Sequence, residues 1–234
     1  MANNITSKIP NTITCCNLLC GCIAVVLALK NQPIYAFSFV FLGAVFDFFD
    51  GMTARLLGVQ SAIGRELDSL ADVITFGFAP SAMLFSMLNT VIYPEFLVPL
   101  KDIFPYTAFL ITAFSALRLA NFNVDTRQLS SFIGLPTPAN ALFWGSYIIY
   151  FKEINSVLTS PILLFVLTLA SCWILNAEIP MFALKFKHWN WSENKTRYVF
   201  ILSCIPLIIL FKSGAFAIII AWYVLLSAVT RRAK

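Results

Sequence analysis

Residues 34–55 read IYAFSFVFLGAVFDFFDGMTAR, an apolar run that carries two aspartates, Asp47 and Asp50, near its end. A helix needs about 20 predominantly apolar residues to cross the hydrocarbon core of a bilayer. Charged side chains inside such a helix are costly and usually functional. The stretch therefore predicts a membrane-spanning helix with a functional site near one end.

The composition of the whole chain also indicates an integral membrane protein. Hydrophobic residues make up 59% of the 234 residues, charged residues make up 12%, and the mean hydropathy is +0.83. An ordinary soluble domain carries about 25% charged residues, so a soluble or disordered protein is excluded. The net charge of +5 does not indicate a nucleic-acid partner, because Lys and Arg are dispersed along the chain. We expect no cleavable signal peptide, and we expect the six cysteines to be reduced packing residues.

Eight apolar segments predict an all-α, polytopic membrane helix bundle, built as a single domain over residues 1–234. Prolines punctuate the gaps between segments or the helix starts. Two of the segments, 138–151 and 197–211, are short for a full crossing. The eight predicted spans are 13–30, 34–54, 67–90, 103–121, 138–151, 157–175, 197–211 and 214–230.

The distribution of basic residues predicts the orientation of these spans. If both termini are cytoplasmic, 12 of the 16 Lys and Arg residues lie on the inner side. The four on the outer side are Lys30, Lys101, Lys152 and Lys212. The positive-inside rule favours this arrangement, so we predict cytoplasmic termini.

Four carboxylates lie at the predicted inner edge of the membrane. Asp47 and Asp50 are three residues apart at the end of the second span, and Asp68 and Asp72 are four apart at the start of the third. At these spacings the two members of each pair share one helix face. The segment between the pairs is long enough to turn back, so two antiparallel helices can point all four carboxylates at one place.

Crowded carboxylates either take up protons or are neutralised by a cation. Hard divalent cations such as Mg²⁺ and Mn²⁺ prefer oxygen ligands, and two such ions can position and polarise a phosphate. The small residues Gly51, Ala54 and Gly64 allow a bulky ligand to approach closely, and Arg55 can contact a phosphate oxygen. The alternative, four solvated acids that merely flank helices, is disfavoured by their number and by these small neighbours.

The run DFFDGMTAR (47–55), a spacer of eight residues, and GRELDSLAD (64–72) together match D-x-x-D-G-x-x-A-R and G-x-x-x-D-x-x-x-D at every fixed position. This pattern resembles the signature of the CDP-alcohol phosphatidyltransferase family. The stretches PNTITCCNLLCG (10–21), LDSLADVITFGFAP (67–80), RLANFN (118–123) and FIGLPTPA (132–139) resemble the branch of that family whose acceptor is L-serine. Asn121 departs from that branch, in which we expect Arg, and this removes a positive charge near the acceptor site.

The resemblance implies an enzyme that transfers the phosphatidyl group from CDP-diacylglycerol to the hydroxyl of L-serine, with CMP as the second product. It implies a site with two divalent cations, Mg²⁺ or Mn²⁺, bound by Asp47, Asp50, Asp68 and Asp72, with Asp72 as general base. Gly51, Ala54, Arg55 and Gly64 would lie against the CDP moiety. It also implies a multi-pass protein of the bacterial inner membrane with the active site facing the cytoplasm, and a homodimer by analogy.

Two polar residues outside the acidic motif have two interpretations each. Asn17 either serves the nucleotide pocket or bridges two helices. Arg118 is either a positive-inside anchor or a bidentate clamp for the serine carboxylate or a substrate phosphate.

Two other functions remain open at this point. The first is the same chemistry with glycerol 3-phosphate or inositol phosphate as acceptor, although a phosphorylated acceptor should require more basic residues than Arg65, Arg118 and Arg127. The second is a cation transporter, although transporters usually place the ion near the membrane midplane between repeats.

Overall fold

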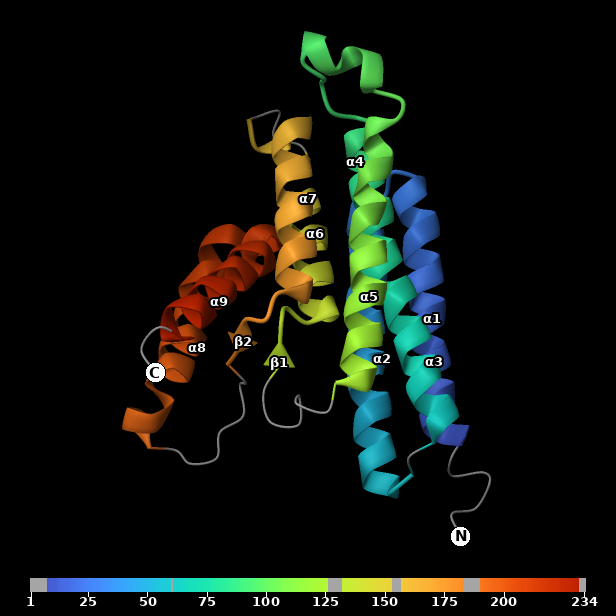
Figure 1. The fold of residues 1–234 in the computed structure, drawn as a ribbon, viewed down its shortest axis with the longest axis vertical. Coiled ribbons are helices and arrows are strands. Elements are labelled where there is room, and N and C mark those ends of the chain that lie inside the picture. Colours follow the sequence, from blue (N-terminus) through green and yellow to red (C-terminus); the bar gives the residue numbers. More distant parts are fainter. Residues whose placement is uncertain (1–7, 60, 126–131, 153–156, 183–189, 232–234) are drawn as a thin grey trace.

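The computed structural model describes residues 8–59, 61–125, 132–152, 157–182 and 190–231, and nearly all of these residues are helical. The predicted all-α bundle is confirmed (Figure 1). The helices are α1 (Lys8–Leu29), α2 (Pro33–Leu57), α3 (Ala62–Asp72), η1 (Val73–Phe78), α4 (Ala79–Leu88), η2 (Glu95–Leu100), η3 (Phe104–Phe109), α5 (Leu110–Val124), α6 (Thr137–Phe151), η5 (Val157–Thr159), α7 (Pro161–Asn176), α8 (Trp191–Phe211), η6 (Lys212–Gly214) and α9 (Ala215–Arg231). Two short strands, β1 (Phe132–Ile133) and β2 (Pro180–Met181), pair antiparallel.

Each of the eight predicted segments corresponds to a described helical stretch, because η1 joins α3 to α4 and η3 continues into α5, whereas η2 corresponds to none of them. Five stretches are long and apolar enough to cross a membrane: Lys8–Leu29, Pro33–Leu57, Ala62–Leu88, Phe104–Val124 and Asn194–Thr230. The last stretch contains both α8 and α9, which contact each other on either side of Lys212, where φ is 45°. Helices α6 and α7 have only 15 and 16 residues. Eight crossings therefore remain a prediction.

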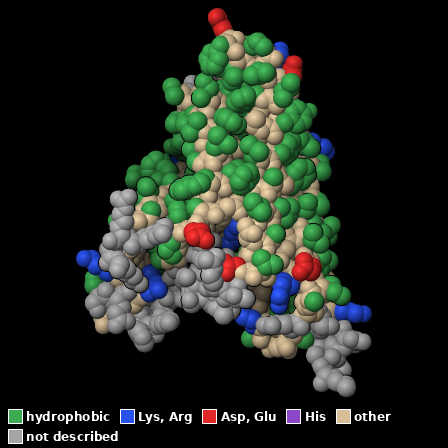
Figure 2. Space-filling view, viewed as in Figure 1, with side chains coloured by type: hydrophobic (Ala, Val, Ile, Leu, Met, Phe, Trp, Pro, Cys, Tyr) green, Lys and Arg blue, Asp and Glu red, His purple; other side chains and the backbone are tan. Residues whose placement is uncertain are grey.

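The continuous helix α3–η1–α4 is the centre of the bundle. About two thirds of its most apolar window is buried, against a third or less in the other four stretches. Its side chains Phe76, Leu84 and Met87 are almost fully buried, as is Trp144 of α6. The outer surface is largely apolar (Figure 2), as expected where lipid rather than water surrounds the protein.

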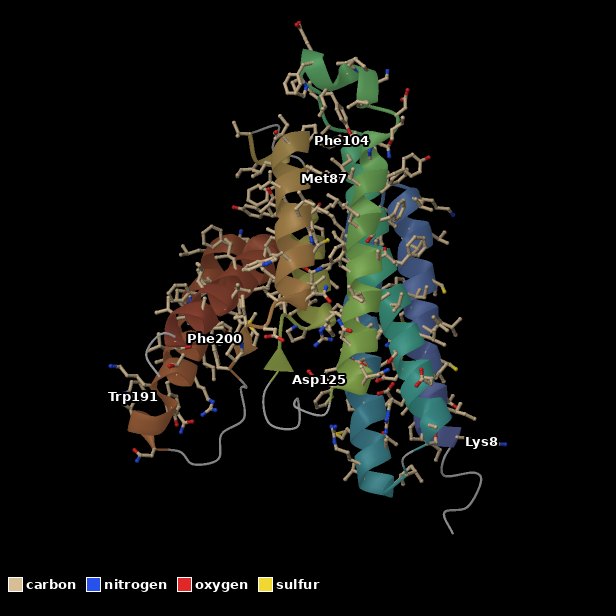
Figure 3. The ribbon with its side chains drawn as sticks, viewed as in Figure 1. Lys8, Met87, Phe104, Asp125, Trp191 and Phe200 are labelled. Atoms are coloured by element: carbon tan, nitrogen blue, oxygen red, sulfur yellow. The ribbon has the colours of Figure 1, made fainter. Side chains whose placement is uncertain are left out.

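The two ends of the bundle differ in the described residues that they carry. In Figure 3, Lys8 at the start of α1, Asp125 after α5 and Trp191 at the start of α8 lie towards one end, whereas Met87 and Phe104 lie towards the other. Figure 2 shows most of the visible Lys and Arg side chains towards the first end. These described residues lie at the ends that the predicted topology gives them, and the orientation of the bundle in the membrane stays a prediction. The chain termini, Arg127 and the basic residues at 185 and 187 lie outside the described residues.

The turn between α2 and α3 brings the two acidic pairs together. Gly58 ends α2 in the left-handed conformation with φ of 62°, which glycine adopts without steric cost. The Gly58 N–H donates to the Arg55 carbonyl and the Val59 N–H to the Ala54 carbonyl, the pattern of a Schellman motif. Ser61 then caps α3, because its Oγ accepts from the Gly64 N–H at 2.9 Å. The chain is thereby reversed within a few residues.

Candidate active site

Three of the four predicted acids form a compact cluster between α2 and α3. Asp47, Asp50 and Asp68 each offer one carboxylate oxygen, and these three oxygens lie within 4.8 Å of one another. Asp50 is 6% exposed, and the other two side chains are half-buried. The structure therefore brings together residues from both halves of the acidic motif.

The donor set of this cluster fits a hard divalent cation. Three carboxylates supply only oxygen ligands, which Mg²⁺ and Mn²⁺ prefer. Among the residues that the structure describes, no Lys or Arg forms an ion pair with them, and the buried Oδ1 of Asp68 has no hydrogen-bond partner there. Close carboxylates with no basic partner need an external positive charge to remain ionised together.

Thr14 of α1 fixes the orientation of one carboxylate in the cluster. Its Oγ1 donates to Asp50 Oδ2 at 2.6 Å, and the threonine side chain is buried. Hydrogen bonds of this kind orient metal ligands and are a regular part of metal sites. Thr14 was not predicted from the sequence as a site residue.

Asp72 lies one turn further along α3 and is held separately from the other three acids. It is 8% exposed and is not a member of the compact cluster. Its Oδ1 accepts a hydrogen bond from Asn17 Nδ2 at 3.3 Å. Asn17 thus links α1 to α3 through Asp72, as the helix-bridge interpretation expects, and its role in the nucleotide pocket stays a prediction.

Arg118 of α5 is buried close enough to Asp72 to interact with it electrostatically. Its guanidinium carbon lies 5.4 Å from the centre of the Phe122 ring. Its Nε has no hydrogen-bond partner among the described residues. A membrane-surface anchor would extend into the headgroup region, so burial favours a ligand contact over a simple anchor. Asn121, the departure from the serine branch, is exposed.

A cleft of about 450 Å³ opens beside the cluster, at the end of the bundle that carries the start of α1. All three small residues predicted for the site, Gly51, Ala54 and Gly64, line this cleft. A Cβ added at Gly51 would meet only Arg55 Nη1, at 3.6 Å, so this glycine faces open space. At Gly64 a Cβ would come within 2.9 Å of Ser61 Oγ and 3.0 Å of Asn11 Oδ1, so the wall is tight there.

A second basic side chain lies at the cleft, in addition to the predicted Arg55. Arg65 is among the lining residues, and Arg55 Nη1 lies 3.6 Å from a Cβ built at the lining residue Gly51. Both arginine side chains are exposed. Asn11, Thr14 and Ser61 also line the cleft and were not predicted. The sequence could have indicated Asn11 and Thr14, because polar residues recur three positions apart, at 11, 14 and 17, in this largely apolar helix.

Comparison with known proteins agrees with this geometry. The sequence profile of the CDP-alcohol phosphatidyltransferase family matches residues 7–170, which contain the acidic cluster, the cleft and Arg118. The chain belongs to the CDP-alcohol phosphatidyltransferase family. It is therefore an enzyme of a phosphotransferase family, with its acidic motif divided between the end of α2 and the start of the central helix.

Several relatives of this chain carry one name, CDP-diacylglycerol–serine O-phosphatidyltransferase. The protein of Bacillus subtilis (strain 168) is 36% identical over 182 residues, which cover 78% of this chain and 91% of that protein. That of Methanocaldococcus jannaschii is 33% identical over 66% of each chain. That of Helicobacter pylori (strain 26695) is 35% identical over 57% of this chain and 54% of its own length. The aligned region thus spans from about half to nearly all of these relatives.

Proposed function

We propose that this protein transfers the phosphatidyl group from CDP-diacylglycerol to the hydroxyl of L-serine, giving phosphatidylserine and CMP. The observation that carries the proposal is the cluster of Asp47, Asp50 and Asp68 with Asp72 beside it, built from the complete family motif. The names of the relatives from three organisms support serine as the acceptor.

The four aspartates are proposed as the ligands of two divalent cations, Mg²⁺ or Mn²⁺. Asp47, Asp50 and Asp68 supply the compact set, and Asp72 completes it. When bound, such ions polarise the phosphoryl oxygens and neutralise charge that develops on the leaving group.

The cleft is proposed as the site of the CDP moiety. Gly51, Ala54 and Gly64 leave room for the pyrophosphate and the nucleotide to approach the helix backbones. Arg65 on the wall and Arg55 at the end of α2 offer guanidinium groups that balance the negative charge of the pyrophosphate. The acyl chains would extend from this cleft into the bilayer along the apolar surface.

The reaction is an in-line displacement at the phosphorus that carries the diacylglycerol. The serine Oγ attacks this phosphorus and forms a new P–O bond, while the P–O bond to the CMP phosphate breaks and its electron pair remains on CMP. The proton of the serine hydroxyl passes to the carboxylate of Asp72 and then to solvent. A serine hydroxyl is a weak nucleophile until its proton is removed, and general-base catalysis of this kind contributes about 10²–10⁴-fold.

Arg118 is proposed to bind the carboxylate of the incoming serine. Its guanidinium is buried near Asp72, and its Nε has no partner within the described part of the chain. A fork of guanidinium donors matches a carboxylate in a bidentate geometry. One buried cation suits an amino-acid carboxylate better than an additional phosphate, which would favour several. We also propose that this end of the bundle faces the cytoplasm, where serine is dissolved, and that the membrane is the inner membrane.

An acceptor panel tests this function. Purified protein with CDP-diacylglycerol and Mn²⁺ is given serine, glycerol 3-phosphate or inositol phosphate, and the lipid products are identified by mass. We expect phosphatidylserine and CMP with serine alone. A product formed with a phosphorylated acceptor in place of serine would reassign the acceptor. The absence of CMP release with every acceptor would favour the cation transporter.

A further inference from the structure

We infer that Asn17 is a positioning residue that orients the carboxylate of Asp72, and that Thr75 in the π-helix η1 holds Asn17 in place. This inference rests on the proposed function, because it takes Asp72 as the group that receives the serine proton. It assigns Asn17 to the acidic motif rather than to the nucleotide pocket.

The contacts form a short chain between three elements. Asn17 is fully buried on α1, and its Nδ2 donates to Asp72 Oδ1 at 3.3 Å. Thr75, also fully buried, donates from Oγ1 to the backbone carbonyl of Asn17 at 3.0 Å. Asp72 and Thr75 lie three residues apart where α3 continues into η1, so α1 is bound twice to one short segment.

Two glycines allow the backbones of α1 and α2 to pack closely against Thr75. A Cβ added at Gly21 of α1 would come within 2.8 Å of Thr75 Cα. A Cβ at Gly43 of α2 would come within 2.5 Å of Thr75 Cγ2 and 3.0 Å of Asn17 Oδ1. The backbones of α1 and α2 thus both pack on Thr75, and that of α2 also lies against the Asn17 amide oxygen, which leaves the amide little room to rotate.

The orientation of the amide decides which oxygen of Asp72 is available. With Nδ2 towards Asp72 the contact is a charge-assisted hydrogen bond, whereas the reversed amide would place Asn17 Oδ1 against a carboxylate oxygen. Oδ1 of Asp72 is therefore engaged by the amide, and Oδ2 with its two lone pairs is left for the proposed cation and for the serine proton. The π-helical segment is consistent with this role, since such segments are frequent at functional sites.

If Asn17 were only a structural link between helices, its contacts would be the same, but its removal would have a different effect. If Asn17 only joins α1 to α3, its removal loosens the protein without a specific effect on turnover. If it positions Asp72, the loss falls on kcat, because a misdirected base slows the chemical step while the substrates still bind.

The test compares variants that keep or remove one hydrogen bond each, in the full-length protein with CDP-diacylglycerol, serine and Mn²⁺. We expect Asn17→Ala to lower kcat by about 10–100-fold, as for partners that orient a metal ligand, with both KM values unchanged. Thr75→Val, which keeps the shape and loses the hydroxyl, lowers kcat in the same way but less. Thr75→Ser keeps the hydroxyl and stays near the wild-type kcat.

Asn176→Ala is the matched control for loss of an interhelical amide. Asn176 of α7 donates from Nδ2 to the Phe114 carbonyl of α5 at 3.1 Å, so its removal should lower the melting temperature and leave kcat unchanged. Thr75→Val and Thr75→Ser carry the test if Asn17→Ala does not fold. An unchanged kcat in Thr75→Val, or an equal loss in Asn176→Ala, would overturn the inference. Failure of the wild-type protein to use serine would instead overturn the proposed function.

Discussion

The substitution Asp72→Asn separates a general base from a metal ligand, and the structure indicates why the variant should fold. Asp72 accepts from Asn17 Nδ2 through Oδ1. The introduced amide can keep this hydrogen bond with its own oxygen, which places its NH₂ group where the second carboxylate oxygen had been. Packing around the buried side chain is retained, because the two side chains have nearly the same shape.

The expected loss follows from what the NH₂ group cannot do. It accepts no proton at neutral pH, and it presents a donor towards the serine hydroxyl. Removal of a general base costs about 10²–10⁴-fold in rate, which corresponds to about 2.7–5.4 kcal/mol of transition-state stabilisation. Asp47, Asp50 and Asp68 remain in place, so affinity for CDP-diacylglycerol should be largely kept.

The assay measures CMP release at saturating Mn²⁺ together with CDP-diacylglycerol binding. We expect turnover to fall by the stated factor while binding changes little. If Asp72 acted chiefly as a ligand, lipid binding would fall as well and added metal would restore activity. Recovery of near-wild-type turnover at high Mn²⁺ would refute the assignment of Asp72 as the base.

Three further predictions concern the metal site, the cleft and the topology. Thr14→Val removes the donor to Asp50 Oδ2 and should raise the Mn²⁺ concentration for half-maximal activity about 10–100-fold. Thr14→Ser keeps the hydroxyl and should leave that concentration unchanged. If the two variants needed the same Mn²⁺ concentration, the role of Thr14 would be contradicted. The added methyl group of Gly51→Ala has room in the free protein, so the melting temperature should not change. It should raise the KM for CDP-diacylglycerol, because the methyl group would block part of the cleft. An unchanged KM would show that Gly51 does not contact this substrate. Cysteines introduced at positions 2 and 233 should resist an impermeant reagent applied outside intact cells, and labelling of either would contradict the cytoplasmic termini.

The helical segments could be predicted because hydropathy reports directly on burial in a bilayer. The segment predicted at 67–90 corresponds to α3–η1–α4, which spans residues 62–88. Its π-helical portion, Val73–Phe78, was not predicted from hydropathy, which does not distinguish a π-helix from an α-helix. The joint packing of α8 and α9 depends on contacts between helices.

The acidic cluster could be predicted because spacing on a helix fixes which side chains share a face. The partners of these acids could not, since they come from α1, which is distant in sequence. Thr14 reaches Asp50 across 36 residues and Asn17 reaches Asp72 across 55.

The most direct test of the account is the stoichiometry of the transfer. Purified protein is incubated with CDP-diacylglycerol, isotope-labelled serine and Mn²⁺, and CMP and labelled lipid are quantified together, with an EDTA-treated sample as control. We predict equal amounts of CMP and labelled phosphatidylserine, and neither product after EDTA treatment. CMP release without labelled lipid, or full turnover after exhaustive EDTA treatment, would contradict metal-dependent phosphatidyl transfer to serine.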